Sequence, residues 1–468
     1  LVGWQSVGEL RGPDGVHRVV EQLAGVQLPA SAVESLILPA RVRDYSPAML
    51  DELMTAGEVL WQGHAALPGD DGWVSLHLAD SAHLSLAVPA ASSVEGSSVE
   101  GPRQGAYDGA TAGEHAERVM RVLEHGGAYF FRALADAVAA DGPLDDATVL
   151  ATMWQLVWEG RLTGDTLAPL RMLLSGGKSA HKSRRSGPRP GRTTRWSRSP
   201  AGLAAGTPRT GRPAMPRRTG PATAAGRWSL LPEPELDGTL RAVATAEQLL
   251  DRYGVVTRGS VMAEGIEGGY AGVYRILASA EEAGRVRRGY FVEHLGAAQF
   301  GTTGAVDRMR ALSEAVERDR GDERSKVVVL AATDPANPYG ASMPWPTRGG
   351  ASGREGRGSR DGGADGVEPA GSQHRPGRKA GALVVLADGA LALYLERGGR
   401  TALTFTDDAD ALGSAAAALA DQVRHRGVAT LTVAKIDGGP ALSSDHPLAG
   451  ALTGAGFHTA PQGLRMRR

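Results

Sequence analysis

The side chains best suited to chemistry lie in residues 281–300, which read EEAGRVRRGYFVEHLGAAQF. A helix-like stretch stops at Gly284, and Arg287, Arg288 and Tyr290 follow it. Guanidinium groups bind phosphates, and a tyrosine ring contacts a sugar or stacks on a base, so this combination indicates contact with nucleic acid. The same residues also fit a solvated hairpin in a module that packs against its neighbours.

Other arginines and a serine occupy predicted helix starts or helix faces. The candidate nucleic-acid contacts are Arg41, Arg43, Arg258, Ser260, Arg275, Arg287, Arg288 and Tyr290. Arginine and serine would bind phosphates, and tyrosine would contact a sugar or a base. Glu281 and Glu282 share a predicted helix with Arg275 and oppose this interpretation, because a helix that approaches DNA is usually more basic.

Motifs for catalysis or cofactor binding are missing from the sequence. The stretch SGGKSA at 175–180 resembles the end of a phosphate-binding loop, but Met172 stands where that loop requires glycine. The twelve histidines form no H-E-x-x-H pattern, and the absence of cysteine excludes thiolate metal sites and disulfides. Asp334 could activate a water for glycosidic cleavage, but its Asp-Pro context favours a turn. No catalytic residue and no metal ligand is assigned.

The glycine that stops the helix belongs to a phrase that occurs three times. Apolar residues three apart, then a glycine, then an apolar residue surround Gly57, Gly160 and Gly284. Such a glycine suits the left-handed cap of a helix. Short predicted helices precede each phrase and a strand follows it, which is the winged-helix arrangement of a helix-turn-helix with a β-hairpin. The second copy leaves little room for a wing.

The sequence predicts an α+β protein of tandem winged-helix modules followed by an antiparallel β-sheet or barrel domain with covering helices. In the last domain, Asp388-Gly389 and Gly398-Gly399 lie between consecutive β-type runs and suit tight hairpins. The expected segments are a winged-helix module at 1–90, a loop at 91–113, a second winged-helix-like module at 114–177, a disordered basic linker at 178–227, a third winged-helix module at 228–318, and a C-terminal β-barrel or α+β domain at 319–468 with a disordered insertion at 347–380.

Charge is distributed unevenly along the 468 residues. The net charge is −1, yet residues 178–227 hold thirteen Lys or Arg and no Asp or Glu, so the remainder carries −14. A basic arm binds nucleic acid through counterion release, whereas the alternative is a solvated linker from a GC-rich genome. We find no apolar run of membrane-spanning length and no signal peptide, which predicts a cytoplasmic protein with no membrane partner. The chain begins at Leu1 and is expected to be a piece of a longer protein.

Four long phrases carry a family resemblance. They are LPARVRDYSPAMLDELMTAGEVLWQG at 38–63, RYGVVTRGSVMAEGIEGGYAGVYRILASAEEAGRVRRGYFVEHLGAAQF at 252–300, VLAATDPANPYGASMPWP at 329–346 and RPGRKAGALVVLADGALALYLERGGRTALTF at 375–405. These phrases resemble the C-terminal region of Lhr, the large helicase-related family of superfamily-two DNA helicases of bacteria, in an actinobacterial style. The resemblance covers nearly all of the chain outside the expected loops.

The resemblance implies a parent that is an ATP-dependent 3′-to-5′ DNA helicase, with its motor domains in the N-terminal part and winged helices ending in a β-barrel module in the C-terminal part. The C-terminal part is also similar to AlkZ-type DNA glycosylases, and activity on uracil is attributed to some members. This chain shows neither a P-loop nor a D-E-x-H box. Its Gln155, Gln299 and Gln422 each stand alone where the AlkZ type has a Q-x-Q pattern.

Three functions are consistent with the sequence. The leading hypothesis is a DNA-binding accessory module of an Lhr-type helicase in DNA repair, with DNA and the motor domains of the same parent as partners and a nucleoid-associated location. A second is a uracil-type DNA glycosylase of the AlkZ-like class, and a third is a platform that assembles homo-oligomers. No cofactor is expected in this chain, and ATP and Mg would belong to the missing motor.

Overall fold

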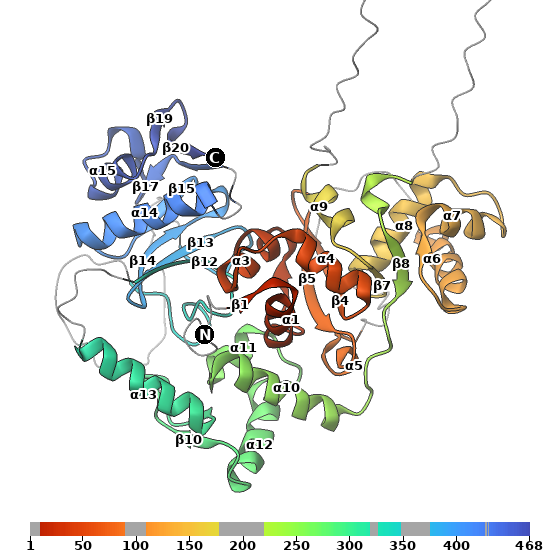
Figure 1. Ribbon diagram of the computed structural model, residues 1–468, viewed down its shortest axis with the longest axis horizontal. Helices are drawn as coiled ribbons and strands as arrows, with labels where there is room; N and C mark the ends of the chain where they lie inside the picture. The colour runs from red at the N-terminus through yellow and green to blue at the C-terminus, as the bar shows by residue number, and fades with distance from the viewer. Residues whose placement is uncertain are drawn as a thin grey trace, which may run out of the picture.

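The computed structural model describes residues 10–88, 109–176, 220–318, 326–347, 375–425, 428 and 430–468. Figure 1 shows a first module at the centre, a second module on its right, a third module below, and a C-terminal domain at the upper left. Every part combines helices with strands, as the α+β class requires.

The first module has three main helices and a β-hairpin. Its elements are β1 (Leu10–Arg11), α1 (Gly12–Gln22), β2 (Leu28–Pro29), α2 (Ala30–Ala32), the π-helix η1 (Val33–Ile37), α3 (Leu38–Arg41), β3 (Val42–Arg43), α4 (Pro47–Ala56), β4 (Val59–Leu67), β5 (Asp71–Leu78) and α5 (Ala82–Ser85). The antiparallel sheet has the order β2-β5-β4. This is the predicted winged-helix topology, with α4 as the recognition helix and β4–β5 as the wing.

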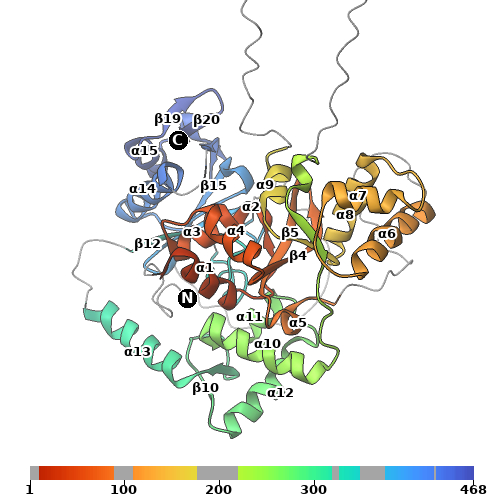
Figure 2. The same ribbon diagram turned by 45° about the vertical axis from the view of Figure 1, so that its right-hand side comes forward.

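The third module repeats this topology. Its elements are α10 (Gly238–Tyr253), β9 (Val255–Val256), α11 (Arg258–Ala263), α12 (Gly269–Glu282), β10 (Arg287–Gly289), β11 (Gln299–Gly301) and α13 (Thr303–Arg318). The sheet order is β10-β11-β9, so α12 is the recognition helix and β10–β11 form the wing. Figure 2 keeps this module at the lower end of the molecule, with α12 pointing away from the other parts.

The second module has the same strand order, although its wing is assembled from distant residues. Its elements are α6 (Gly109–Glu124), β6 (Tyr129–Phe130), α7 (Phe131–Ala139), α8 (Asp146–Trp158), β7 (Leu162–Gly164), α9 (Ala168–Leu174), the 3₁₀ helix η2 (Ala222–Ala224) and β8 (Arg227–Leu230). Its sheet has the order β6-β8-β7. The sequence placed the end of the basic linker at 227 and the third module from 228, whereas β8 completes the second module. The basic segment therefore lies between β7 and β8 in the sequence, and its residues 178–219 are outside the described residues.

The three repeated glycines end the recognition helices in the same way. Gly57, Gly160 and Gly284 have φ of 82°, 73° and 72°. In each case the amide of the next residue reaches back to the helix, for example from Arg285 N to Ala280 O at 2.9 Å. This bond belongs to the Schellman motif, which satisfies helix carbonyls that would otherwise lack a partner. The repeated phrase is thus a helix C-cap before a wing.

Replacement of Gly284 by valine is expected to lower the free energy of unfolding of the third module by about 1 kcal/mol or more, because a β-branched residue is strained at positive φ. A Cβ at Gly284 meets nothing within 4 Å, so the cost is conformational and not steric. Gly272→Val is the matched control, since Gly272 lies inside α12 and its Cβ also enters open space. Urea unfolding measures both variants, and equal midpoints would contradict the cap.

The C-terminal domain is built on an open sheet. Its elements are β12 (Val327–Ala331), β13 (Leu383–Ala387), β14 (Ala390–Leu395), η3 (Arg397–Gly399), β15 (Thr401–Thr404), α14 (Ala409–His425), β16 (Thr430–Val433), β17 (Lys435–Ile436), β18 (Gly439–Pro440), η4 (Ala441–Ser443), α15 (Pro447–Gly454), β19 (His458–Ala460) and β20 (Gly463–Arg467). The six-stranded sheet runs β12-β13-β14-β15-β17-β18, and β16-β20-β19 form a second sheet. The described strands do not close, so of the two predicted alternatives the domain has the open sheet and not the barrel.

Different groups pack against the two faces of the six-stranded sheet. Helix α14 packs against β12, β13 and β14 on one face. On the other face, Tyr339 and Trp345 stack with ring centroids 6.2 Å apart, and Trp345 meets the edge of Tyr394. The tight turns after β13 and β14 use Asp388-Gly389 and Gly398-Gly399, all at positive φ, as the sequence suggested.

Buried polar contacts join the first module to the C-terminal domain and to the third module. Arg41 of α3 binds Asp334 through two hydrogen bonds of 2.9 and 2.6 Å, and both side chains are almost completely buried. Arg252 of α10 donates to the carbonyls of Gln22 and Ala24 at 3.0 and 2.7 Å, which caps the C-terminal end of α1. The first contact thus ties the first module to the C-terminal domain, and the second ties it to the third module.

Candidate nucleic-acid interface

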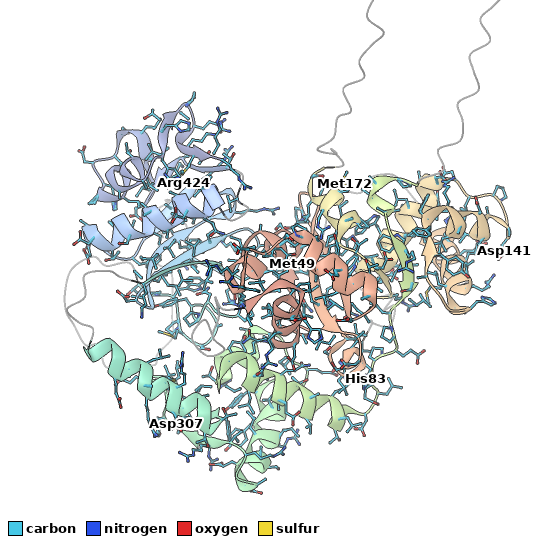
Figure 3. The ribbon with its side chains drawn as sticks, viewed as in Figure 1. Met49, His83, Asp141, Met172, Asp307 and Arg424 are labelled. Atoms are coloured by element: carbon cyan, nitrogen blue, oxygen red, sulfur yellow. The ribbon has the colours of Figure 1, made fainter. Side chains whose placement is uncertain are left out.

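Residues of the second module hold one side of the recognition helix of the first module, while Glu52 and Thr55 of this helix remain exposed. Asp51 of α4 accepts hydrogen bonds from Thr166 Oγ1 and Leu167 N, and Arg171 of α9 binds both Asp51 (2.6 Å) and Glu34 (2.5 Å). Burial opposes ionisation of Asp51, but the bonds from Arg171 and Thr166 hold its pKa below the ordinary value. Met49 and Met172 mark these two neighbouring helices in Figure 3.

The recognition helix of the second module is covered by the wing of the first. Helix α8 packs against β4. A Cβ added at Gly63 would lie 2.5 Å from the carbonyl oxygen of Val157, and one at Gly72 would lie 2.3 Å from the ring of Trp158. Trp61 also donates its indole N–H to Gly164 O at 3.0 Å. Two glycines thus allow α8 to dock too closely on the hairpin for DNA to enter between them.

The recognition helix of the third module has an open face. Its main neighbours are α10, α11 and β10 of its own module. Between α12, α11 and the wing loop runs a groove of about 770 Å³, lined by Arg258, Met262, Gly268, Tyr270, Ala271, Tyr274, Arg275, Leu295, Gly296, Ala297 and Ala298. In a winged helix, the recognition helix and the wing are the elements that approach nucleic acid.

Arginine side chains surround the two tyrosines of this groove. Arg288 of β10 donates to Tyr274 Oη at 2.7 Å, and its Nε lies 3.2 Å from Glu281. Burial and the neighbouring Tyr274 raise the pKa of Tyr270, while the positive charges of Arg258 and Arg288 act in the opposite direction. Both arginines are therefore close enough to the groove to make its electrostatic potential more positive.

The wing loop is held by a buried glutamine. Gln299 is fully buried, and its amide nitrogen donates to the carbonyls of Val292 and Gly296 at 2.8 and 2.7 Å. Its carbonyl oxygen accepts from the amides of Phe291 and Val292 at 3.2 and 2.9 Å. Tyr270 Oη donates to Ala298 O and ties α12 to the same loop. The groove is consequently fixed in shape on both sides.

The structure places three of the six third-module candidates, Arg258, Arg275 and Arg288, at the groove. Arg258 and Arg275 line the groove and are exposed. Arg287 is exposed on β10, and Arg288 reaches the groove through Tyr274. Tyr290 follows β10 in the wing loop with 79 % of its surface exposed. These positions are compatible with contact to a nucleic acid.

Ser260 and Arg41 are corrections to the sequence-based set. Ser260 is fully buried, and it forms a capping box with Thr257 at the start of α11, so its hydroxyl serves the helix and not a phosphate. Arg41 is 2 % exposed and its guanidinium is occupied by Asp334. Arg43 is exposed on the first module, beside Asp44 at 3.9 Å and outside the groove.

Asp334 has a structural partner on each side. Burial alone would raise its pKa, but Arg41 holds that pKa below the ordinary carboxyl value. Its Oδ1 also accepts from Ala336 N at 2.8 Å, which is the turn role predicted for this Asp-Pro segment. Arg378 donates to the carbonyl oxygens of Thr333 and Asp334 at 2.9 and 3.0 Å. A carboxylate bound in this way is not free to activate water.

Tyr270, Tyr274 and Met262 belong to the lining of the groove and were not predicted from the sequence. The spacing of Tyr270 and Tyr274 was a usable signal, because residues four apart share one face of a helix. Met262 carried no signal in the sequence. Its place on the groove depends on how α11 packs against α12.

Neither a metal centre nor a membrane span is visible in the described part of the chain. Across the described ranges, no group of three His, Asp or Glu side chains is arranged to hold a metal ion. The described helices include none with the length and apolar character needed to cross a bilayer. The expectation of no cofactor stays a prediction.

Strand orders β2-β5-β4 and β10-β11-β9, each behind a helix-turn-helix, define a protein of the winged-helix class. Residues 1–79 and 235–321 match two family models, both described as large helicase-related protein, winged-helix domain. The chain belongs to this large helicase-related (Lhr) family, in which it corresponds to a C-terminal part.

Two curated relatives support this assignment over almost the whole chain. One is the "Lhr helicase/ probable uracil glycosylase" of Mycolicibacterium smegmatis, 44 % identical over 478 aligned residues that cover 100 % of this chain and 28 % of the relative. The other is the "Lhr helicase/uracil glycosylase" of Escherichia coli K12, 36 % identical over 98 % of this chain and 26 % of the relative. The chain thus spans about a quarter of the length of each relative.

Proposed function

We propose that this chain is a DNA-binding accessory part of an Lhr-type helicase that acts in DNA repair, and that it binds DNA through the third module. The observation that carries the proposal is the groove beside α12 with Arg258 and Arg275 on its walls. The corresponding helices α4 and α8 each bind a neighbouring module along one side. We therefore assign DNA contact to α12, the recognition helix beside the groove with its two arginines.

The double variant Arg258→Ala/Arg275→Ala is expected to weaken binding to DNA of any sequence and to reduce the slope of log K against log salt by about 1 to 2 units, since each arginine neutralises about one phosphate. Fluorescence anisotropy of a labelled oligonucleotide across a salt series measures both quantities. Arg258 and Arg275 are exposed, so their removal should leave folding intact.

Arg310→Ala is the matched control for this experiment. Arg310 lies on α13 with 66 % of its side chain exposed, pairs with Asp307, and is not part of the groove. Figure 3 labels Asp307 at the lower left, on the same helix. A parental salt slope in the double variant, or an equal loss in Arg310→Ala, would overturn the assignment of the groove.

The remaining parts of the proposal concern partners. The motor domains of the same parent would hydrolyse ATP with Mg²⁺, and this chain would supply none of that chemistry because it contains no phosphate-binding loop. Purified chain that hydrolyses ATP in a DNA-stimulated manner would contradict this division of labour.

Glycosylase activity is a second candidate, because the printed names of both relatives include uracil glycosylase. Asp334 does not serve as its base in this structure, since Arg41 occupies both carboxylate oxygens. The deciding measurement is incubation of the chain with a uracil-containing oligonucleotide, followed by alkaline cleavage at abasic sites. Product at the uracil position would support this activity in the chain itself.

A further inference from the structure

We infer that the groove of the third module accepts an unpaired base of single-stranded DNA, an inference that rests on the DNA-binding function proposed above. The groove combines two properties that seldom meet on a surface. Its lining includes two tyrosine rings and a methionine, together with Arg258 and Arg275. A nucleotide with an exposed base has the complementary pair of properties, an apolar ring face and a charged phosphate.

The walls of the groove suit the face of a base. Tyr270 and Tyr274 lie with ring centroids 5.9 Å apart at an interplanar angle of 62°. Met262 is 58 % exposed, and Leu295 lines the groove from the wing loop. Aromatic and apolar side chains bind bases through their ring faces, without preference for sequence. In a duplex the faces of the bases are stacked against neighbouring base pairs, so only an unpaired base has a face free to contact these side chains.

The side chains of α12 are poorly suited to reading a duplex. The helix reads GYAGVYRILASAEE and contains no Asn, Gln or Lys. Arg275 is its only basic residue, and arginine makes the commonest specific contact with base edges in the major groove. Glu281 and Glu282 end the helix and repel phosphates. The favourable surface of α12 is thus limited to the groove.

The groove is also preformed, with its walls ordered before any ligand binds. Gln299 fixes the wing loop through four hydrogen bonds, and Tyr270 links α12 to Ala298 of that loop. Arg288 holds Tyr274 from the wing side. A site that is already ordered loses little conformational freedom when a ligand enters. The hydrogen bonds that order the groove therefore favour binding of a base without rearrangement.

The test compares a short oligothymidylate with an abasic strand of equal length, which has the same phosphates and lacks the bases. The whole chain is expected to bind the intact strand about fivefold or more tightly, as stacking of one base would provide. Met262→Glu, which places a polar carboxylate on the wall, should reduce this ratio towards one. Fluorescence anisotropy competition measures the ratio directly.

Leu312→Glu is the matched control, because Leu312 is a 45 % exposed apolar residue on α13 outside the groove. It adds the same charge and should keep the parental ratio. Equal binding of intact and abasic strands, with the Arg258→Ala/Arg275→Ala variant still defective, would overturn base binding and leave the proposed function standing. If the chain binds neither these strands nor a duplex, both proposals fail.

Discussion

Asp334→Ala is expected to lower the free energy of unfolding by about 3–5 kcal/mol, the largest effect of any single substitution considered for this protein. The side chain is 1 % exposed and accepts two hydrogen bonds from Arg41. Removal of the carboxylate leaves the Arg41 guanidinium buried without its counter-charge, and a buried unpaired charge is strongly destabilising. Urea unfolding followed by circular dichroism measures the change.

The same pair predicts a dependence on pH. The pKa of Asp334 is lower in the folded chain than in the unfolded one. Its contribution is therefore fully present above the unfolded value of about 4, and it is lost as the pH falls towards the folded value. The parent should lose stability in acid more steeply than Asp334→Ala. Parallel acid titration curves for the two proteins would show that Asp334 does not supply this contribution.

Two further variants separate pairing from mere burial. Arg41→Met combined with Asp334→Ala removes both charges, and it should be less destabilising than Asp334→Ala alone. Asp421 is an exposed partner of Arg424 in the same domain, with 3.6 Å between the charged atoms. Asp421→Ala should lower the free energy of unfolding by at most about 1 kcal/mol. If Asp334→Ala costs no more than Asp421→Ala, the buried pair does not hold the first module to the C-terminal domain.

Local signals in the sequence predicted the repeated units well. A helix that ends at glycine and a strand that follows it depend on only a few neighbouring residues, so Gly57, Gly160 and Gly284 could be read directly. The hairpins at Asp388-Gly389 and Gly398-Gly399 were readable for the same reason. The choice between an open sheet and a barrel was not, because it depends on which edge strands meet.

Long-range contacts account for the errors. Arg41 and Asp334 are 293 residues apart, and no short pattern distinguishes a buried ion pair from an exposed arginine. Strand β8 joins a sheet whose previous strand, β7, ends at Gly164, so a local reading assigned it to the next module. The contacts of α4 and α8 with neighbouring modules likewise join distant parts of the chain. Three recognition helices could be predicted from the sequence, whereas the groove beside α12 depends on how α11, α12 and the wing loop pack.

Gly63→Val carries the second largest expected effect, about 1–3 kcal/mol, through the contact that covers α8. A Cβ at this position would lie 2.5 Å from Val157 O and 3.1 Å from the Trp158 ring. A backbone carbonyl cannot rotate away as a flexible side chain would, so α8 must move from the hairpin. Tryptophan fluorescence reports this shift, because Trp154 and Trp158 lie near the contact with centroids 5.5 Å apart.

Ala66→Val is the matched control, since Ala66 is exposed on the same strand β4 and valine is favoured in strands. It should change stability by less than about 0.5 kcal/mol. DNA affinity should remain at the parental value in both variants, because α12 and its groove belong to another module. If Gly63→Val loses stability and gains DNA affinity together, displacement of α8 uncovers a second DNA-binding helix, and the assignment of contact to α12 alone would have to be abandoned.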